Sequence, residues 1–516
     1  MRGIFLIAVF GSALCAGCGG NGGGSSPAAP VSMSVSPATG QTIKQGASLS
    51  ISAAVFPQFG QGVAWSVLGP GALTFQPMSP TTSTVTYTAP VGVTDYTYAV
   101  VTATSIDNPS ISASLPFTVL PANAFPNVQP VNVDGGPVPG QVYPNGAFTS
   151  VTICTPGTLN CTTINGILVD TGSSGLRILA SALPPLPALT DQNGGVINEC
   201  VQSADQSYIW GTVELADVRI AGEAASSISI HALADPTSFS IPSACTSGSA
   251  GADRNSQQAL GANGILGVGL EPQDCGNLCV DGSPPVPAYY SCTDNSCSPS
   301  LVQLAQQVSH PALFFTKDNN GVALQFPPLS GSAPTLSGSL VFGIGTETNN
   351  TLGNATIFTV DLNDHFITNL ASTGQSLTSS FIDSSSSGFF FPDDSIPTCS
   401  DNAFFCPATL TPLTGVTVAA NTEQGTLFPL GQGTINFSVD NADNLLGTYP
   451  TNAAISTLAG PNGSGSCSGG TGACSFDWGF PFFYGRNVFV AIRGQSVPSS
   501  APPSPWWAYT TNFVTQ

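Results

Sequence analysis

The chain has 516 residues, enough for two to four domains, and its low share of charged residues (7%), with 57 Gly and 43 Pro, is typical of a β protein with many turns. Eight Lys and Arg against 28 Asp and Glu give a net charge of -20, which argues against nucleic acid or anionic lipid headgroups as partners. We therefore expect an all-β protein with no nucleic-acid partner.

The first 18 residues, "MRGIFLIAVFGSALCAGC", combine one cation with an apolar run that is too short for a convincing membrane span, which is typical of an export signal. The segment "LCAGC" resembles the lipobox of bacterial lipoproteins, although Cys15 stands where Leu is usual. The resemblance implies that Cys18 becomes the acylated first residue and that residues 19–30 form a flexible tether. An ordinary cleaved signal followed by a linker is the alternative. We expect a protein of the bacterial cell envelope, periplasmic or surface-exposed, whose membrane contact is the lipid anchor only.

Residues 31–120 alternate between apolar and polar side chains in short runs such as "SLSISAAVF" and "TSTVTYTAP". Turns rich in Pro and Gly interrupt these runs, which predicts the strands of a β-sandwich. The segment resembles the immunoglobulin-like domains of bacterial surface proteins, with Trp65 expected in the core on a middle strand. The resemblance implies a spacer or an adhesive module without chemistry.

The rest of the chain contains an internal near-repeat around an acidic residue. The sequence "DTGSSGL" at residues 170–176 is echoed by "DSSSSGF" at residues 383–389, and each copy follows an apolar run. Each is also followed, later in its half, by an apolar segment that carries glycine: "NGILGVGL" from Asn263 and "FDWGFPFF" from Phe476. Two equivalent halves with one carboxylate each predict a site shared between two lobes.

The first copy is similar to the active-site motif of pepsin-like aspartic proteases, and "GILG" at residues 264–267 resembles their apolar-apolar-Gly signature. The segment "YIWGTVELADVRIAG" resembles their flap hairpin, with Trp210, Gly211 and Thr212 standing where they carry Tyr-Gly-Thr. The form "VDTGSSGLR" is also similar to a family of bacterial exported proteins that share this motif.

Two later segments extend the resemblance. "GSLVFGIGTETNN" from Gly338 resembles the segment that opens the second lobe of the pepsin-like enzymes, and "WGFPFFYGRNVFVAI" from Trp478 resembles their closing segment. The resemblance implies a two-lobed, pepsin-like β fold after the sandwich, with lobes at residues 125–335 and 336–516.

The same resemblance implies that Asp170 and Asp383 form a catalytic pair in which one ionised carboxylate activates water and one protonated carboxyl polarises the scissile carbonyl. Such an enzyme is an acid-active endopeptidase that takes a peptide or protein substrate and needs no cofactor. We expect it to be a monomer.

Four neighbouring residues would support the two carboxyls: the paired hydroxyls of Thr171 and Ser384, and the amide donors of Gly172 and Ser385. Ser385 departs from the Gly of the motif and adds a Cβ where the two loops approach each other. This departure favours the alternative function, a catalytically degenerate surface protein with a binding or structural role.

Arg177 stands where the pepsin-like enzymes carry an aromatic residue. It is interpreted either as a surface charge, or as a residue that stacks on Trp210 or accepts an acidic substrate group. The three histidines, His231, His310 and His365, lie far apart in the sequence and are predicted to be structural.

Setting Cys15 and Cys18 aside leaves 12 of the 14 cysteines, and an exported chain favours disulfides between them. Four pairs are predicted, three of them from a shared C-x6-C spacing: Cys154 with Cys161, Cys399 with Cys406, Cys467 with Cys474, and the remaining Cys200 with Cys245. The last four cysteines are Cys275, Cys279, Cys292 and Cys297. They could form a zinc ribbon, but an oxidising compartment favours nested disulfides among them, and the sequence does not say which cysteine pairs with which. We predict six disulfides and no metal site.

The lipid anchor is testable on the mature protein. We expect mass spectrometry of the amino terminus to find Cys18 acylated, because the lipobox directs cleavage and acylation to that residue. An unmodified terminus at another residue would reject the anchor.

Overall fold

The structure, a computed structural model, describes residues 32–38, 41–56, 62–75, 83–93, 97–122, 125–203, 207–233, 239–246, 253–282, 288–293, 296–420, 431–462 and 475–511. Most of the regular structure in these ranges is β-sheet, and the α-helices have four to seven residues, so the predicted all-β class is confirmed. The predicted signal, tether and acylated Cys18 lie outside the described residues. Within these ranges, no helix is long and apolar enough to cross a bilayer.

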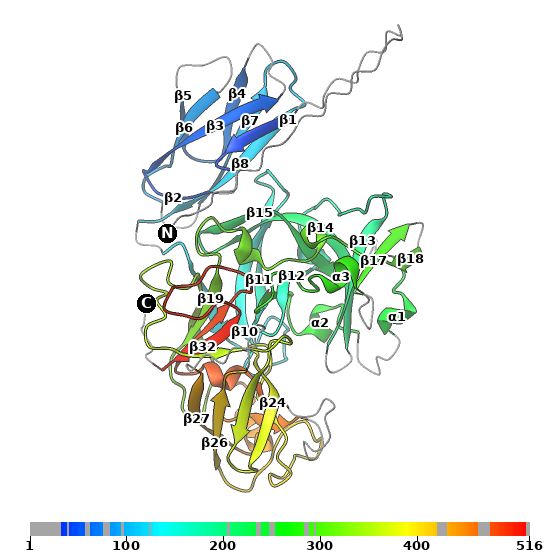
Figure 1. The fold of residues 1–516 in the computed structure, drawn as a ribbon, viewed down its shortest axis with the longest axis vertical. Coiled ribbons are helices and arrows are strands. Elements are labelled where there is room, and N and C mark those ends of the chain that lie inside the picture. Colours follow the sequence, from blue (N-terminus) through cyan, green and yellow to red (C-terminus); the bar gives the residue numbers. More distant parts are fainter. Residues whose placement is uncertain are drawn as a thin grey trace, which may run out of the picture.

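The first domain is a sandwich of two four-stranded sheets at one end of the molecule (Figure 1). One sheet is antiparallel, and the other is mixed because β2 pairs with β8 in parallel. In their spatial order, the strands are β1 (Ser32–Ser36), β3 (Ser48–Phe56), β6 (Ser83–Thr88) and β5 (Ala72–Phe75) in one sheet, and β2 (Gln41–Lys44), β8 (Ser112–Leu120), β7 (Thr97–Ser105) and β4 (Val63–Leu68) in the other.

Trp65 does not occupy the predicted position in this sandwich. It lies on β4, which pairs only with β7 and forms the edge of its sheet, so the middle-strand prediction is wrong. Its side chain is half-buried, and its Nε1 donates to Ser83 Oγ over 2.6 Å. The fully buried core is instead made by residues such as Ile51, Val85 and Phe117.

The remaining residues form a fifteen-stranded sheet and a seven-stranded sheet, together with a short two-stranded pairing. The first half contributes β9 (Val128–Val133), β10 (Ala147–Cys154), β11 (Cys161–Asp170), β12 (Ser174–Leu179), β13 (Val196–Gln202), β14 (Tyr208–Ile220), β15 (Glu223–Leu233), β16 (Gly264–Val268), β17 (Tyr289–Thr293) and β18 (Ser296–Pro299), with helices α1 (Ser243–Thr246), α2 (Gln257–Leu260) and α3 (Leu278–Asp281).

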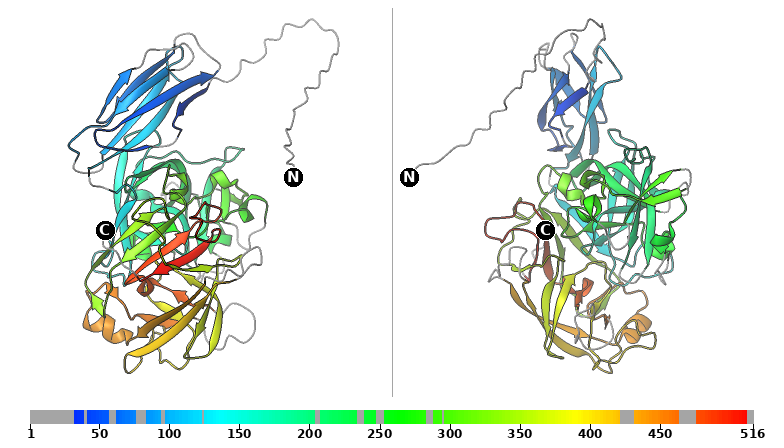
Figure 2. Two further views of the ribbon diagram at one scale, coloured as in Figure 1. Left: turned by 60° about the vertical axis from the view of Figure 1, so that its left-hand side comes forward. Right: turned by 45° about the vertical axis from the view of Figure 1, so that its right-hand side comes forward.

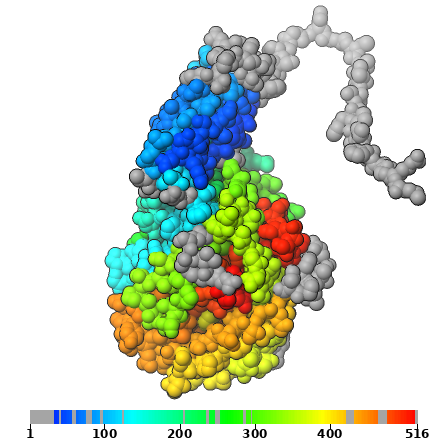
Figure 3. All heavy atoms as spheres, turned by 90° about the vertical axis from the view of Figure 1, so that its left-hand side faces the viewer, coloured from blue at the N-terminus to red at the C-terminus, as the bar shows by residue number. Residues whose placement is uncertain are grey.

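The second half contributes β19 (Gly321–Phe326), β20 (Ser332–Ala333), β21 (Leu336–Phe342), β22 (Thr356–Thr359), β23 (Phe366–Leu370), β24 (Gln375–Ile382), β25 (Phe389–Phe391), β26 (Thr411–Val418), β27 (Gln432–Val439), β28 (Ala454–Ile455), β29 (Ala459–Pro461), β30 (Asp477–Trp478), β31 (Arg486–Ala491) and β32 (Trp506–Thr510), with helix α4 (Ala442–Thr448). Figure 3 shows that the yellow and orange residues of this half form the end of the molecule opposite the blue sandwich.

Strands from distant parts of the chain meet in the middle of the large sheet. β21 pairs with β9 on one side and with β19 on the other, and β19 then pairs with β31. The red C-terminal strands therefore lie between the green and yellow regions in Figure 2. The sheet runs without a break through the lobe boundary that we predict near residue 335.

The two copies of the near-repeat have the same strand pairing. β11 ends at Asp170 and pairs in parallel with β16, which also pairs antiparallel with β12. β24 ends just before Asp383 and pairs in parallel with β30, which also pairs antiparallel with β25. Each acidic loop therefore joins the two outer strands of a three-strand unit, and the glycine-containing apolar segments found in the sequence supply the middle strand.

The sandwich docks on the turn between β14 and β15. The Tyr98 ring of the sandwich lies 4.2 Å from Arg219 Cζ, a cation–π contact, and the Thr42 hydroxyl donates to the carbonyl of Gly222. A Cβ at Gly222 would lie 2.9 Å from Pro126 Cα, so this turn needs glycine to admit the linker that follows the sandwich.

Five disulfides lie among the described residues. Three are the predicted pairs Cys154–Cys161, Cys200–Cys245 and Cys399–Cys406. The last group is paired sequentially, as Cys275–Cys279 and Cys292–Cys297, so the nested arrangement is wrong. Cys292 and Cys297 face each other across the β17–β18 ladder, which fixes their pairing locally. The predicted Cys467–Cys474 pair lies outside the described residues.

A buried acidic residue makes the stability of this fold depend on pH. Glu223, the first residue of β15, is 3% exposed, and burial, with the nearby Asp318 carboxylate, raises its pKa from 4.5 to about 8. A folded-state pKa above the unfolded value means that the folded chain binds the proton more tightly. The resulting stability is fully present below about pH 4.5 and is lost as the pH rises through about 8.

We therefore expect Glu223→Gln, which mimics the protonated side chain, to match the wild type near pH 4 and to be more stable at pH 8. Each proton held only by the folded state changes the free energy of unfolding by about 1.4 kcal/mol per pH unit. Denaturant unfolding at several pH values measures the difference, with the exposed Asp394→Asn as a control. Parallel pH curves for wild type and Glu223→Gln would contradict the assignment.

Candidate functional site

Asp170 and Asp383, the two acids of the near-repeat, meet at the ends of β11 and β24. Their carboxyl groups lie close enough for the charge of Asp383 to act on Asp170, although the two acids belong to different halves of the chain. Asp170 is 8% exposed and Asp383 is half-buried. A Cβ at Gly172 would lie 3.0 Å from Asp383 Cγ, so any larger residue there would press on the Asp383 side chain.

Thr171 and Ser384 lock the two loops together by crossed hydrogen bonds. The Thr171 amide donates to Ser384 Oγ over 3.0 Å, and the Ser384 amide donates to Thr171 Oγ1 over 2.9 Å. Each hydroxyl in turn donates to a backbone carbonyl of the opposite strand, Thr171 to Ile382 and Ser384 to Val169. Every polar atom of this buried network has a partner, as a rigid network requires. The two hydroxyls therefore fix the loops, as the sequence predicts.

The Asp170 carboxyl accepts two hydrogen bonds from its own loop. The Gly172 amide donates to Oδ1 over 2.8 Å, and Ser173 Oγ donates to Oδ2 over 2.5 Å. Both bonds favour the ionised form, but burial and then the charge of Asp383 outweigh them and raise the pKa of Asp170 to about 7. Asp170 therefore keeps its proton across the acid range.

The Asp383 carboxyl accepts three hydrogen bonds. The amide and the hydroxyl of Ser385 donate to Oδ1 over 2.7 and 2.8 Å, and Ser386 Oγ donates to Oδ2 over 2.8 Å. Ser385 thus turns its side chain onto its own carboxylate and does not block the approach of the loops. The departure from the Gly of the motif supplies a hydroxyl donor that glycine lacks.

The pair opens into a cleft made of two adjoining cavities. One, of about 360 Å³, is lined by both acids, by Ser385 and Ser386, and by Arg254. The other, of about 420 Å³, is lined by carboxylates that include Glu271 and Asp364. Both cavities share Ser173, Arg177 and Val201, so they continue one another on either side of these residues.

The flap prediction at Trp210, Gly211 and Thr212 is wrong. These residues are buried inside β14, and the Trp210 ring packs on Tyr290 at 5.3 Å. A Cβ at Gly211 would lie 1.9 Å from the Ala232 carbonyl oxygen, so this glycine serves the packing of β14 against β15.

The hairpin that reaches the cleft turns earlier, between the end of β13 and the start of β14. Its residues Val201, Ser203, Ser207 and Ile209 line the cavity that holds the acid pair. Because neighbouring residues of a strand point to opposite faces, Ile209 faces the cleft while Trp210 faces away from it. The polar residues Ser203 and Ser207, between two runs of apolar residues, are the sequence signal that would have located this hairpin.

Arg177 is neither a surface charge nor a partner of Trp210. It is 3% exposed, and its Nη2 donates to Glu199 Oε1 over 3.0 Å and to Asp274 Oδ2 over 2.9 Å. Its Nη1 donates to the carbonyl of Ser174, in the loop that carries Asp170. The arginine therefore supports the loop that carries Asp170, together with two carboxylates that the sequence did not reveal.

The three histidines have different surroundings. His231 Nδ1 lies 3.0 Å from Glu199 Oε2, and burial, followed by the charge of Arg177, lowers the pKa of His231 to about 3. His310 Nδ1 accepts a hydrogen bond from the Ala312 amide. These two roles are structural, whereas His365 lines the second cavity of the cleft.

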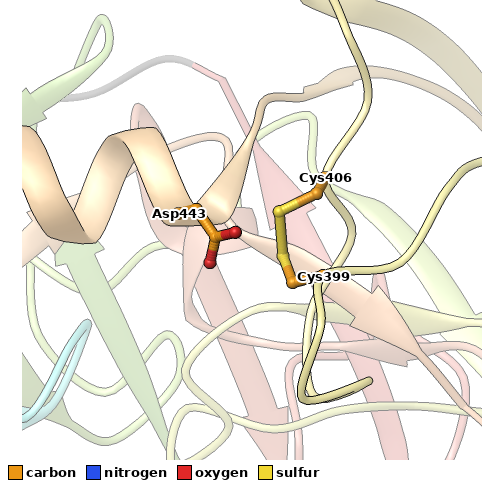
Figure 4. A group of neighbouring side chains, drawn as sticks. All are labelled: Cys399, Cys406 and Asp443. Carbon is orange, nitrogen blue, oxygen red and sulfur yellow. A yellow bond between two sulfur atoms is a disulfide. The ribbon is translucent and has the colours of Figure 1, made fainter.

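One group of metal-ligating residue types gathers beside α4. Cys399, Cys406 and Asp443 have ligand atoms within 4.8 Å of one another. Figure 4 shows that the two sulfur atoms are bonded to each other, so neither is a thiolate that could bind a metal.

Comparison with known proteins assigns the chain to a family. The family model described as "Protein of unknown function (DUF3443)" matches residues 123–509, which include both acidic loops and exclude the sandwich. The chain belongs to this family. No curated protein matches the chain.

The close approach at Gly172 is testable by one substitution. We expect Gly172→Ala to lower the free energy of unfolding by roughly 1–3 kcal/mol, because the added methyl meets an Asp383 side chain that three donors hold in place. Gly447→Ala, where an added Cβ meets nothing within 4 Å, should be neutral or slightly stabilising. Denaturant unfolding at pH 5 compares the two variants with the wild type. If Gly172→Ala were as stable as Gly447→Ala, the loops that carry Asp170 and Asp383 would be further apart than the structure places them.

Proposed function

We propose that this member of the DUF3443 family is an aspartic endopeptidase that hydrolyses peptide bonds with Asp170 and Asp383 and needs no cofactor. The observation that carries the proposal is the pairing of two carboxyls, one from each copy of the repeat, which act on each other electrostatically and line the same cavity. Two neighbouring carboxyl groups cannot both ionise cheaply, because their negative charges repel each other. A purely structural role therefore gives no reason to place two acids side by side.

The surroundings of the two acids suggest their roles. Asp383 has three hydrogen-bond donors and is the ionised base, while Asp170, with its pKa raised to about 7, is the protonated acid. A water between them gives a proton to Asp383 as its oxygen attacks the scissile carbonyl carbon, and Asp170 gives its proton to the carbonyl oxygen. The product of this step is a neutral tetrahedral diol.

The second step returns the pair to its starting state. Asp383 gives the proton taken from water to the amide nitrogen, and the C–N bond breaks. Asp170 takes a proton back from one hydroxyl of the diol as the new carboxyl group forms. Protons and charge balance over the two steps, and no cofactor enters them.

The two-lobed, pepsin-like architecture is part of the same proposal. The identical strand pairing around Asp170 and Asp383 supports it, as do the crossed hydrogen bonds of Thr171 and Ser384. An extended peptide would lie along the two adjoining cavities, with the hairpin residues Ser203 and Ser207 over it. The five disulfides support an extracytoplasmic site of action, with the lipid anchor at Cys18 as the proposed attachment.

We expect peptide cleavage to follow a bell-shaped pH profile. Because Asp170 must carry a proton, activity should be lost as the pH rises through about 7, and it should also fall in strong acid as the base becomes protonated. Asp170→Asn and Asp383→Asn should each lower the rate by about 10²- to 10⁴-fold or more without unfolding the protein. Cleavage of a peptide library between about pH 2 and 8 is the measurement.

Asp443→Asn, at a carboxyl that lines neither cavity, is the matched control and should cleave at the wild-type rate. A wild type that cleaves no peptide would refute the proposed function. Cleavage that survives either active-site substitution would leave a hydrolase with a different catalytic pair.

A further inference from the structure

A third buried carboxyl lies behind the proposed catalytic pair, on the side of Asp383. Asp477 begins β30 and is 7% exposed. Its Oδ2 lies 2.6 Å from Ser386 Oγ, and the same Oγ lies 2.8 Å from Asp383 Oδ2. The Ser386 hydroxyl therefore stands between two carboxyl groups, at hydrogen-bond distance from each.

This arrangement fixes the number of protons. A serine hydroxyl has one hydrogen to donate, so it can donate to only one of the two carboxyl groups. The other contact must be a hydrogen bond in which a protonated carboxyl donates to Ser386 Oγ. One of Asp383 and Asp477 therefore carries a proton on the oxygen that faces Ser386.

The surroundings of Asp477 favour it as the proton carrier. Its other oxygen, Oδ1, is buried and has no hydrogen-bond partner among the residues that the structure describes, which is costly for a carboxylate and far less so for a neutral carboxyl. In the sheet, Asp477 pairs with Phe381 of β24 and with Phe390 of β25, and both of these neighbours are apolar.

The charged groups that act on Asp477 are Asp383 and Asp170, both acids. Burial, followed by the charge of Asp383, raises the pKa of Asp477 well above its ordinary value.

The first copy of the repeat provides an internal comparison. The register of β11 with β16 matches that of β24 with β30, and it sets Ile265 opposite Leu168, as Asp477 is set opposite Phe381. The position of Asp477 is therefore apolar in the first copy, and Ser173, the counterpart of Ser386, donates to Asp170. The extra carboxyl is a feature of the second copy.

We propose that Asp477 is a positioning residue: it stays protonated, donates to Ser386 Oγ, and thereby turns the Ser386 hydroxyl onto Asp383 Oδ2, which keeps the negative charge of the pair on Asp383. The proposal rests on the proposed endopeptidase function for its kinetic consequence. The protonation of Asp477 does not depend on that function.

The kinetic test compares two substitutions in the full chain. Asp477→Asn keeps a donor for Ser386 Oγ and should leave kcat and the pH profile close to those of the wild type. Asp477→Leu removes the donor, frees the Ser386 hydroxyl to turn away, and should lower kcat about tenfold with KM unchanged.

If Asp477 were ionised, Asp477→Asn would remove a negative charge, and both limbs of the pH profile would move to lower pH. That shift would overturn the proposal. A wild-type kcat in the Asp477→Leu variant, if it folds, would also overturn it.

The second readout needs no activity. Infrared difference spectra between the wild type and Asp477→Asn at pH 6 should contain the carbonyl stretch of a protonated carboxyl, assigned to Asp477. A difference that contains only carboxylate bands would refute the proposal. If the wild type cleaves no peptide but the protonated band is present, the endopeptidase function fails while the protonation of Asp477 stands.

Discussion

The crossed hydrogen bonds between Thr171 and Ser384 are the constraint on which the site depends. They join residues 213 positions apart and leave each loop bonded to the strand that carries the other acid. With the loops held in this way, the carboxyls of Asp170 and Asp383 come close together, and a Cβ at position 172 would lie 3.0 Å from Asp383 Cγ. The closeness of the two acids, and with it the chemistry proposed for them, follows from this one contact between the two halves.

The two halves share a frame but differ in what surrounds each acid. Asp170 has two donors and lies deeper, whereas Asp383 has three donors and is half-buried. Two residues of the second copy account for much of the difference in surroundings. Ser385 stands where the first copy has Gly172, and Asp477 stands where it has Ile265. Both differences support the separate roles that we propose for two acids which the repeat alone would make equivalent.

The sequence could predict the acid pair because its signal is local: an apolar run, an acid and a serine-rich turn, repeated once. The flap prediction failed because a three-residue likeness, Trp210 to Thr212, did not say which face of β14 each side chain occupies. Arg177, Glu199 and Asp274 could not be grouped from the sequence, since Asp274 lies 97 positions from the arginine it binds. Sandwich strands were visible as alternation, whereas the edge position of β4 depends on pairing that alternation does not encode.

Carboxyl-carbon NMR of the wild type across the pH range tests the central claim, that Asp170 and Asp383 share one proton, most directly. The account predicts that both carbons shift together in two separated steps, one of them near pH 7, because the protons belong to the pair. Two independent single transitions, with Asp170 titrating in the ordinary range of an exposed aspartate and Asp383 unaffected by it, would contradict the account.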